Sequence, residues 1–390
     1  MSTITRNSEQ LLYLMACALQ GVSAREEVLA DADLKQLLIM ARKHSVASMV
    51  CMALEKTAIF ANADEATKKQ WIDAKNKAIR KNMLLDAERK IISHELETQG
   101  IWYMPLKGSI LKDWYPKPGM REMADNDILF DASKRKEVKA IFQGRGYTVK
   151  GYNKSNHDAY EKPPIYNFEM HVELYHKIYD TFNEKYADVK QRLIPDAEVP
   201  YRLHFTPEDF YAFVIAHAYK HYSGSGTGIR TLADIYIMNQ KLGGTMNWEY
   251  VDSELRGMGI FSYERESREL AQKLFGIAEL PTEANLSETE QQMLAYYLGA
   301  STYGTIENRT LNKMRKLQPD GGAITAHTKR KYLLSRIFPG REWCEAYAPT
   351  VYKYPVLLPF FWVWRLIYKG ITKRKKATQE IKALKAASRR

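Results

Sequence analysis

Two aspartates separated by one residue are the feature of the sequence that points most directly to chemistry. Asp125 and Asp127 belong to the segment 125–130, which ends in an apolar run and predicts a buried strand with both carboxylates on one face. Two such charges repel each other without a cation, and Mg²⁺ prefers carboxylate, water and phosphate oxygens. The pattern therefore favours a magnesium site. A solvated turn is the alternative, because Asp and Asn are common turn residues.

A glycine and a serine precede these aspartates at the end of another apolar segment. Residues 101–104 predict a short strand, and Gly108 and Ser109 follow it at the start of a predicted helix. Glycine lets backbone N–H groups approach a phosphate, the helix N-terminus favours an anion, and Lys107 adds positive charge. Such a pair is often an ordinary turn, but its position before the aspartates favours a phosphate-binding role.

A third carboxylate is expected on a neighbouring strand. Residues 166–175 predict a long strand on which Glu169, His171 and Glu173 share one face. We expect Glu169 to complete the shell of the catalytic metal and to accept the proton of an acceptor hydroxyl, with Glu173 in reserve. The alternative is an amphipathic strand with a solvated polar face.

A later helix carries groups that suit a triphosphate. His217, Lys220 and His221 lie on one helix face, and Arg230 follows the loop 223–228, which is rich in serine and glycine. Their donors and charges match phosphate oxygens, so we expect them to form the second half of a nucleotide site. An aromatic helix with an exposed polar face is the alternative.

Arg121 and Asp234 are two further charged residues near these motifs. We expect Arg121 to orient Asp125 or to contact the nucleotide. Asp234 follows Arg230 on the same predicted helix, so the two could instead form a structural ion pair.

The elements that position these residues predict an α+β protein. Helical spacing dominates residues 7–97, strands alternate with helices in the centre, and helices resume near residue 207. We predict five regions, which are an N-terminal helical region (1–97), a catalytic core (98–180), a helical segment completing the nucleotide site (181–245), a C-terminal helical region (246–353) and an aromatic and basic tail (354–390).

Length and composition indicate a folded, cytoplasmic protein. The chain has 390 residues, of which 12% are aromatic and 27% charged, enough for substantial buried cores. Cys17, Cys51 and Cys344 lack any metal-ligand spacing and are expected to be reduced. The apolar run 11–19 resembles a short signal-peptide core, but Glu9 precedes it and no clear cleavage site follows.

The net charge of +12 is concentrated in the tail. Aromatic residues in the segment 354–368 precede a basic run, a pattern that suits an anionic lipid surface. A helix that caps the core and a solvated tail is the alternative, and RNA binding is a third. The basic residues of the tail are Lys369, Lys373, Arg374, Lys375, Lys376, Lys382, Lys385, Arg389 and Arg390, against the acidic Glu380.

Several of these motifs together resemble the uncharacterised bacterial nucleotidyltransferases of the DNA-polymerase-β-like superfamily. The resemblance covers roughly residues 98–240. Its pieces are Leu106-Lys107-Gly108-Ser109, Tyr115-Pro116, Arg121-Glu122-Met123-Ala124-Asp125-Asn126-Asp127-Ile128-Leu129, Glu169-Met170-His171, Ala216-His217-Ala218-Tyr219-Lys220-His221, Gly228-Ile229-Arg230 and Ala233-Asp234-Ile235.

The resemblance implies a small mixed-sheet core and the transfer of a nucleoside monophosphate from a nucleoside triphosphate, with two Mg²⁺ ions and release of pyrophosphate. It implies that Gly108 and Ser109 grip the triphosphate, that Asp125 and Asp127 bind both ions and that Glu169 completes the shell of the catalytic ion. Two departures from the family pattern are Asn126, where an apolar residue is commoner, and Glu rather than Asp at position 169.

The sequence leaves the hydroxyl acceptor open. A small molecule, a sugar intermediate, a protein side chain and an RNA end all fit one donor site, because donor chemistry and acceptor recognition are separate problems. The rival function is a catalytically inactive nucleotide-binding or partner-binding protein on a transferase core, tethered to a membrane surface by its tail.

Overall fold

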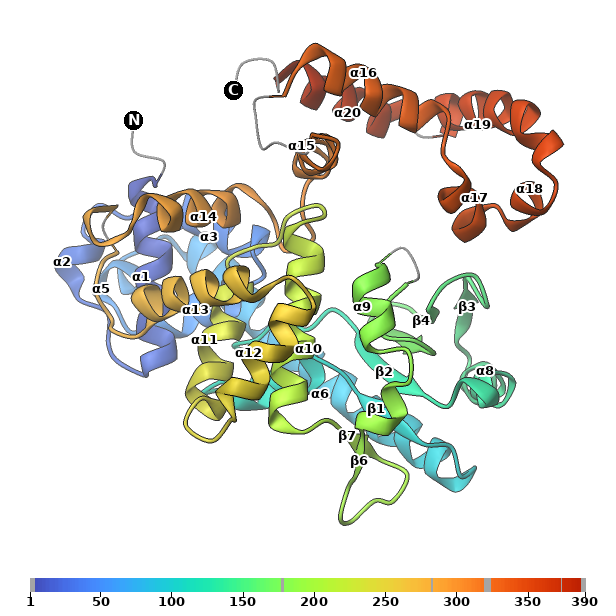
Figure 1. Ribbon diagram of the computed structural model, residues 1–390. Coiled ribbons are helices and arrows are strands. Elements are labelled where there is room, and N and C mark those ends of the chain that lie inside the picture. Colours follow the sequence, from blue (N-terminus) through green and yellow to red (C-terminus); the bar gives the residue numbers. More distant parts are fainter. Residues whose placement is uncertain (1–3, 177–178, 282, 319–323, 373, 387–390) are drawn as a thin grey trace.

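The computed structural model describes residues 4–176, 179–281, 283–318, 324–372 and 374–386. A small mixed sheet lies to one side of a helical core that is built by helices from before and after the sheet in the sequence (Figure 1). This α+β arrangement, a small mixed sheet flanked by helical regions, is the fold class that the sequence predicts.

The chain begins with helices that end in a long α6. Asp64 caps α6 by accepting from the backbone N–H of Thr67. Trp71 of α6 is buried among the other helices, whereas Ile92 and Leu96 near its end are buried against the sheet. One helix therefore connects the two cores. The helices are α1 (Arg6–Gln20), α2 (Glu26–Leu29), α3 (Leu34–Lys43), α4 (Ala47–Leu54), α5 (Ala58–Ala61) and α6 (Glu65–Thr98).

The sheet has the strand order β1-β2-β5-β4-β3. The central pair β2 and β5 is parallel, and the other neighbours are antiparallel. Short α7 (Gly108–Leu111) follows β1, and α8 (Arg135–Gly144) buries its apolar face against the sheet. The strands are β1 (Tyr103–Pro105), β2 (Asn126–Phe130), β3 (Thr148–Lys150), β4 (His157–Lys162) and β5 (Tyr166–His171).

The structure differs from the prediction at β4 and β5. We did not predict β4, because buried Asp158 interrupts its apolar pattern; Arg135 of α8 neutralises this carboxylate at 2.6 Å. The predicted strand 166–175 was wrong at its end, since β5 stops at His171. Beyond it, the N–H of Val172 donates to the carbonyl of Asn156.

Helices after the sheet complete the helical core. Helix α13 packs against both α1 and α11, so helices from before and after the sheet share one interior. A small antiparallel pair, β6 (Ile194–Pro195) and β7 (Leu203–His204), precedes them. The helices are α9 (Asp180–Lys185), α10 (Pro207–Tyr222), α11 (Arg230–Leu242), α12 (Trp248–Gly257), α13 (Phe261–Phe275) and α14 (Glu288–Gly299).

The C-terminal helices form an arm that extends away from the helical core (Figure 1). Helix α20 packs against α15, and Glu380 pairs with Arg336 at 2.8 Å. Among the described residues, no helix combines the length and hydropathy that a transmembrane span requires. The arm comprises α15 (Ile306–Lys316), α16 (Ala326–Ile337), α17 (Arg341–Tyr347), α18 (Pro349–Lys353), α19 (Leu358–Thr372) and α20 (Arg374–Ala386).

The predicted basic run of the tail lies mostly outside the described side chains. Lys382 is described and is exposed. The remaining basic side chains of the tail fall outside that description, and these are Lys369, Lys373, Arg374, Lys375, Lys376, Lys385, Arg389 and Arg390.

Candidate active site

Three carboxylates gather where β2 begins. Asp125 directly precedes β2, and Asp127 lies in register with Glu169 on the parallel neighbour β5. Burial and the neighbouring carboxylates of Asp127 and Glu169 raise the pKa of Asp125. Burial and Asp127 likewise raise the pKa of Glu169. The three groups therefore repel one another strongly, which is the electrostatic setting that a divalent cation relieves.

Asn126 lies between the two aspartates and faces the other side of the strand. Its side chain is fully buried, donates to the carbonyl of Leu85 at 3.0 Å and accepts from Arg89 at 2.9 Å. Both partners belong to α6, so Asn126 anchors β2 to that helix. Strand alternation then fixes Asp125 and Asp127 on the opposite face. Sequence reasoning treated Asn126 as a departure from the family pattern and missed this role.

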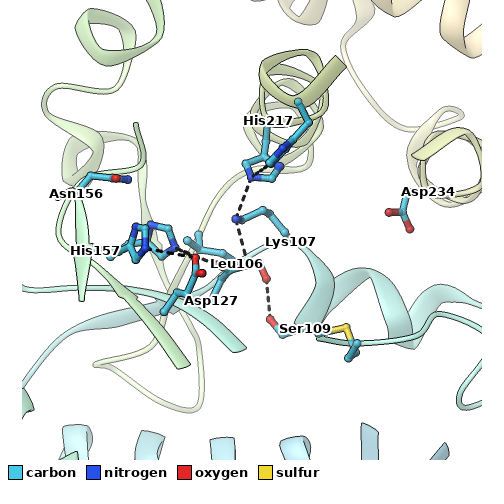
Figure 2. A network of polar contacts seen from close by, with 12 residues as sticks. Leu106, Lys107, Ser109, Asp127, Asn156, His157, His217 and Asp234 are labelled. Carbon is cyan, nitrogen blue, oxygen red and sulfur yellow. Dashed lines mark hydrogen bonds and ion pairs between the residues drawn. The ribbon is translucent and has the colours of Figure 1, made fainter. Parts of the chain in front are cut away.

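Lys107 places a positive charge beside the carboxylates (Figure 2). Its Nζ lies 3.1 Å from Oδ2 of Asp127 and 3.2 Å from Nε2 of His217. Burial disfavours the charged form of Asp127, but Lys107 and His171 together hold its pKa well below the usual range. The backbone of Lys107 has φ 45°, a left-handed conformation that is uncommon for a residue with a side chain. The turn before α7 therefore aims this lysine at Asp127.

Gly108 and Ser109 form a tight turn beside Lys107. A Cβ at position 108 would lie 2.5 Å from Nη1 of Arg121, so a side chain there would collide with a buried guanidinium. The Ser109 hydroxyl is buried and donates to the carbonyl of Leu106 at 2.9 Å (Figure 2). In this structure the serine hydroxyl holds the turn that presents Lys107.

Two histidines adjoin Glu169 on the strands β4 and β5. His157 lies in register with His171, and its Nε2 is 3.8 Å from Oε2 of Glu169. Nε2 of His171 lies 3.7 Å from the same oxygen and 2.9 Å from Oδ1 of Asp127. One potential ligand atom from each of His157, Glu169 and His171 lies within 4.8 Å of the others, so these three side chains can approach one cation.

Sequence reasoning did not identify His157, because it lies on the unpredicted strand β4. It also expected Glu173 to share the strand face with Glu169. Glu173 lies beyond the end of β5 and is exposed, with its N–H directed to the carbonyl of Asn156. Of the two candidate glutamates, Glu169 is the one that adjoins Asp127.

The polar face of α10 approaches the same place. His217 contacts Lys107, and Nε2 of His221 lies 3.3 Å from Nε2 of His217. Burial and the nearby Lys107 lower the pKa of Lys220 to about 8, while Asp127 and Glu169 oppose that shift. The ammonium group of Lys220 therefore lies within the field of the carboxylates.

Arg121 and Asp234 form a buried structural pair. The guanidinium donates to both carboxylate oxygens of Asp234, at 2.7 and 2.9 Å, and the Tyr115 hydroxyl donates to the same carboxylate at 2.7 Å. The expected pairing of Asp234 with Arg230 is wrong, because Arg230 donates instead to the carbonyl of Glu122 at 3.0 Å. The pair fastens the segment before Asp125 to α11.

The model of a family described as "Uncharacterised nucleotidyltransferase" matches residues 30–276. The match spans α3 to α13 and includes the entire sheet and each carboxylate of the site. Because it covers more than half of the chain, the protein belongs to this family and thus to the nucleotidyltransferases. No curated protein and no solved structure matched the chain.

Proposed function

We propose that the protein is a Mg²⁺-dependent enzyme that transfers a nucleoside monophosphate from a nucleoside triphosphate to a hydroxyl acceptor and releases pyrophosphate. The observation that carries this proposal is the register of Asp127 with Glu169, beside Asp125 and opposite Lys107. Converging carboxylates of this kind fit hard divalent cations, and their raised pKa values at Asp125 and Glu169 express a repulsion that such a cation removes.

Each carboxylate has a distinct role in the proposed reaction. Asp125 and Asp127 hold two ions, and Glu169 completes the shell of the catalytic ion and accepts the proton of the attacking hydroxyl. When bound, Mg²⁺ supplies positive charge to the α-phosphate and to the leaving pyrophosphate. Asn126 keeps the aspartates on one face through α6, so the carboxylates are positioned before the substrate arrives.

The donor triphosphate is held by residues around Lys107 in this proposal. We assign its grip to Gly108 and Ser109 with Lys107, and its further charge neutralisation to Lys220, His221 and Arg230. Arg121 acts through Asp234, which fixes the segment before Asp125, rather than through free guanidinium donors. Arg121 is therefore a positioning residue for the metal-binding carboxylates, whereas the other residues contact phosphate in this proposal.

The test is transfer of label from α-labelled nucleoside triphosphates, with simultaneous measurement of pyrophosphate, in the presence of pooled small-molecule, sugar, protein and RNA acceptors. We expect Mg²⁺-dependent transfer that Asp125→Asn/Asp127→Asn abolishes. Nucleotide and metal binding without turnover over all pools would favour the inactive binding protein instead. Equal Mg²⁺-nucleotide binding by the double variant and the wild type would refute the site assignment.

We also propose that the protein resides in the cytoplasm and binds the anionic inner face of the membrane through α19. Helix α19 exposes aromatic and aliphatic side chains together, with exposed fractions of 74% for Phe360, 57% for Trp364 and 60% for Ile367. The basic residues that follow in sequence add attraction for anionic lipid. Exposed aliphatic groups favour a lipid surface over RNA, which offers them no apolar phase.

A further inference from the structure

Two histidines and one glutamate share a face of the antiparallel pair β4 and β5. His157 and His171 are direct partners across the two strands, and Glu169 precedes His171 by two residues on β5. Directly opposed residues and residues two apart on one strand point to the same face of a sheet. The partner of Glu169 on β4 is Ala159, whose side chain is a single methyl group. The strand register therefore brings two imidazoles and a carboxylate together.

The separations of these three groups suit ligands of one ion. Nε2 of His157 and Nε2 of His171 lie 3.8 and 3.7 Å from Oε2 of Glu169, and one ligand atom from each residue lies within 4.8 Å of the others. Zn²⁺ binds imidazole nitrogen and carboxylate oxygen at about 2.0–2.2 Å, which places tetrahedral ligands about 3.4 Å apart, so side-chain shifts of about 1 Å or less would complete the site. Within the described part of the chain, no other group of three histidine, cysteine or acidic side chains meets this distance.

Glu169 lacks a permanently charged cation as its direct partner. Lys107 contacts Oδ2 of Asp127 at 3.1 Å, and no lysine or arginine among the residues that the structure describes forms an ion pair with Glu169. The other oxygen of Asp127, Oδ1, lies 2.9 Å from Nε2 of His171, so this carboxylate is within reach as a fourth ligand. The side chains of His157 and Glu169 keep exposed fractions of 32% and 31%. An ion can therefore enter from solvent while His171 stays buried.

The donor atoms select the kind of ion. Mg²⁺ prefers oxygen ligands, whereas imidazole nitrogen suits Zn²⁺ and related transition-metal ions. Two histidines and one glutamate, with a further position left open, form a ligand set that catalytic Zn²⁺ sites use. We infer that His157, Glu169 and His171 bind a transition-metal ion of the Zn²⁺ type, and that this ion is the catalytic ion assigned above to Glu169.

This assignment divides the two ions of the site by chemistry. Mg²⁺ accompanies the triphosphate on the oxygen ligands of Asp125 and Asp127, while the transition-metal ion is bound before the nucleotide arrives. The role of that ion in transfer rests on the proposed function, whereas its binding by the two histidines does not.

The test measures metal binding by the full chain after removal of metal and without nucleotide. Calorimetry compares Zn²⁺ with Mg²⁺, and X-ray absorption at the zinc edge counts the imidazole ligands of bound Zn²⁺. We expect tighter binding of Zn²⁺ than of Mg²⁺, with two imidazole ligands. His157→Gln should leave one imidazole ligand and weaken Zn²⁺ binding by at least about tenfold, since even the loss of an outer-shell partner costs that much. Its Mg²⁺ affinity and melting temperature should stay nearly unchanged. His94→Gln replaces an exposed histidine of α6 and is the matched control, which should bind both ions normally.

The outcomes separate this inference from the proposed function. Zn²⁺ bound by the wild type without imidazole ligands, or bound as tightly by His157→Gln as by the wild type, would overturn the inference and leave the transferase proposal standing. Weaker binding of Zn²⁺ than of Mg²⁺ by the wild type would overturn it as well. Two imidazole ligands in a protein that transfers no label from nucleoside triphosphates would confirm the metal ligands and refute the catalytic role of the ion.

Discussion

Replacement of Lys107 by methionine tests whether this lysine acts as the counter-ion of the carboxylates when no metal is bound. Methionine keeps an unbranched apolar stem and the same left-handed backbone constraint, so the change removes mainly the charge. The Lys107 and Asp127 side chains retain only 13% and 14% exposure, and their charged atoms lie 3.1 Å apart.

The expected size of the effect follows from that burial. Removal of one partner of a buried ion pair typically costs roughly 3–5 kcal/mol. Because both side chains keep some contact with solvent, we expect the metal-free variant to lose about 2–4 kcal/mol of unfolding free energy at neutral pH. Bound Mg²⁺ takes over the compensating charge, so the loss should fall by at least half in saturating Mg²⁺.

The pH dependence of the loss has a defined sign. The lowered pKa of Asp127 contributes stability above its unfolded value of about 3.9, and that contribution disappears as the pH falls toward the folded value. The difference between wild type and variant should therefore be largest near neutral pH and shrink below about pH 4. Urea denaturation with EDTA or with Mg²⁺ measures it. Equal stability in EDTA, or equal losses in both media, would refute the counter-ion role.

Three further predictions concern Asn126, the protonation of Asp125 and Glu169, and the exposed apolar side chains of α19. Asn126→Ala should lower the unfolding free energy by roughly 2–3 kcal/mol, because it removes the buried hydrogen bonds that Asn126 makes to the carbonyl of Leu85 and from Arg89. Urea denaturation measures this against Asn76→Ala, an exposed asparagine of α6, and matching curves would contradict it. The raised pKa values of Asp125 and Glu169 mean that Mg²⁺ must displace protons from these groups. Mg²⁺ affinity should therefore rise between about pH 6 and 8, by up to about tenfold per pH unit for each proton released. A Mg²⁺ affinity that calorimetry finds to be independent of pH would count against this linkage. Phe360→Ser/Trp364→Ser should reduce flotation with anionic liposomes several-fold, since it removes exposed apolar area. The control Ile39→Ser removes an exposed apolar side chain elsewhere and should float normally. Unchanged flotation of the double variant would exclude α19 as the contact surface.

Local pattern was sufficient to predict where the candidate carboxylates lie on the strands. The alternation of Asp125, Asn126 and Asp127 before apolar residues predicts a strand with two carboxylates on one face, and β2 forms there. Glu169 was selected from a second apolar strand, and the structure places it in register with Asp127. The period of two along a strand predicts the shared face in both segments, whereas the preference for Glu169 over Glu173 came from the unit Glu169-Met170-His171.

Tertiary partners account for what the sequence did not predict. Strand β4 escaped detection because Asp158 is buried only by virtue of Arg135 on another element, and His157 was missed with it. The partner of Asp234 was misassigned for the same reason, since Arg121 lies far from it along the chain. Side chains that meet only after folding leave no periodic signal.

A cavity of about 400 Å³ that several cations line is a further example of tertiary assembly. Arg42, Lys81 and Arg230 come from three helices, α3, α6 and α11, and each resembles an ordinary solvated helix residue in the sequence. Their convergence near Ala124, the residue before Asp125, becomes visible only when the helical core is assembled beside the sheet.

Direct measurement of metal binding tests the central claim that the three carboxylates hold divalent cations for a nucleotide. Mn²⁺ shares the oxygen-ligand preference of Mg²⁺ and can be counted by electron paramagnetic resonance. With α,β-methylene-ATP present, we predict about two bound Mn²⁺ ions per wild-type chain, as a two-metal site requires, and loss of this binding in Asp127→Asn and Glu169→Gln. The same number of bound ions, with the same affinity, in both variants would contradict the assignment of the site.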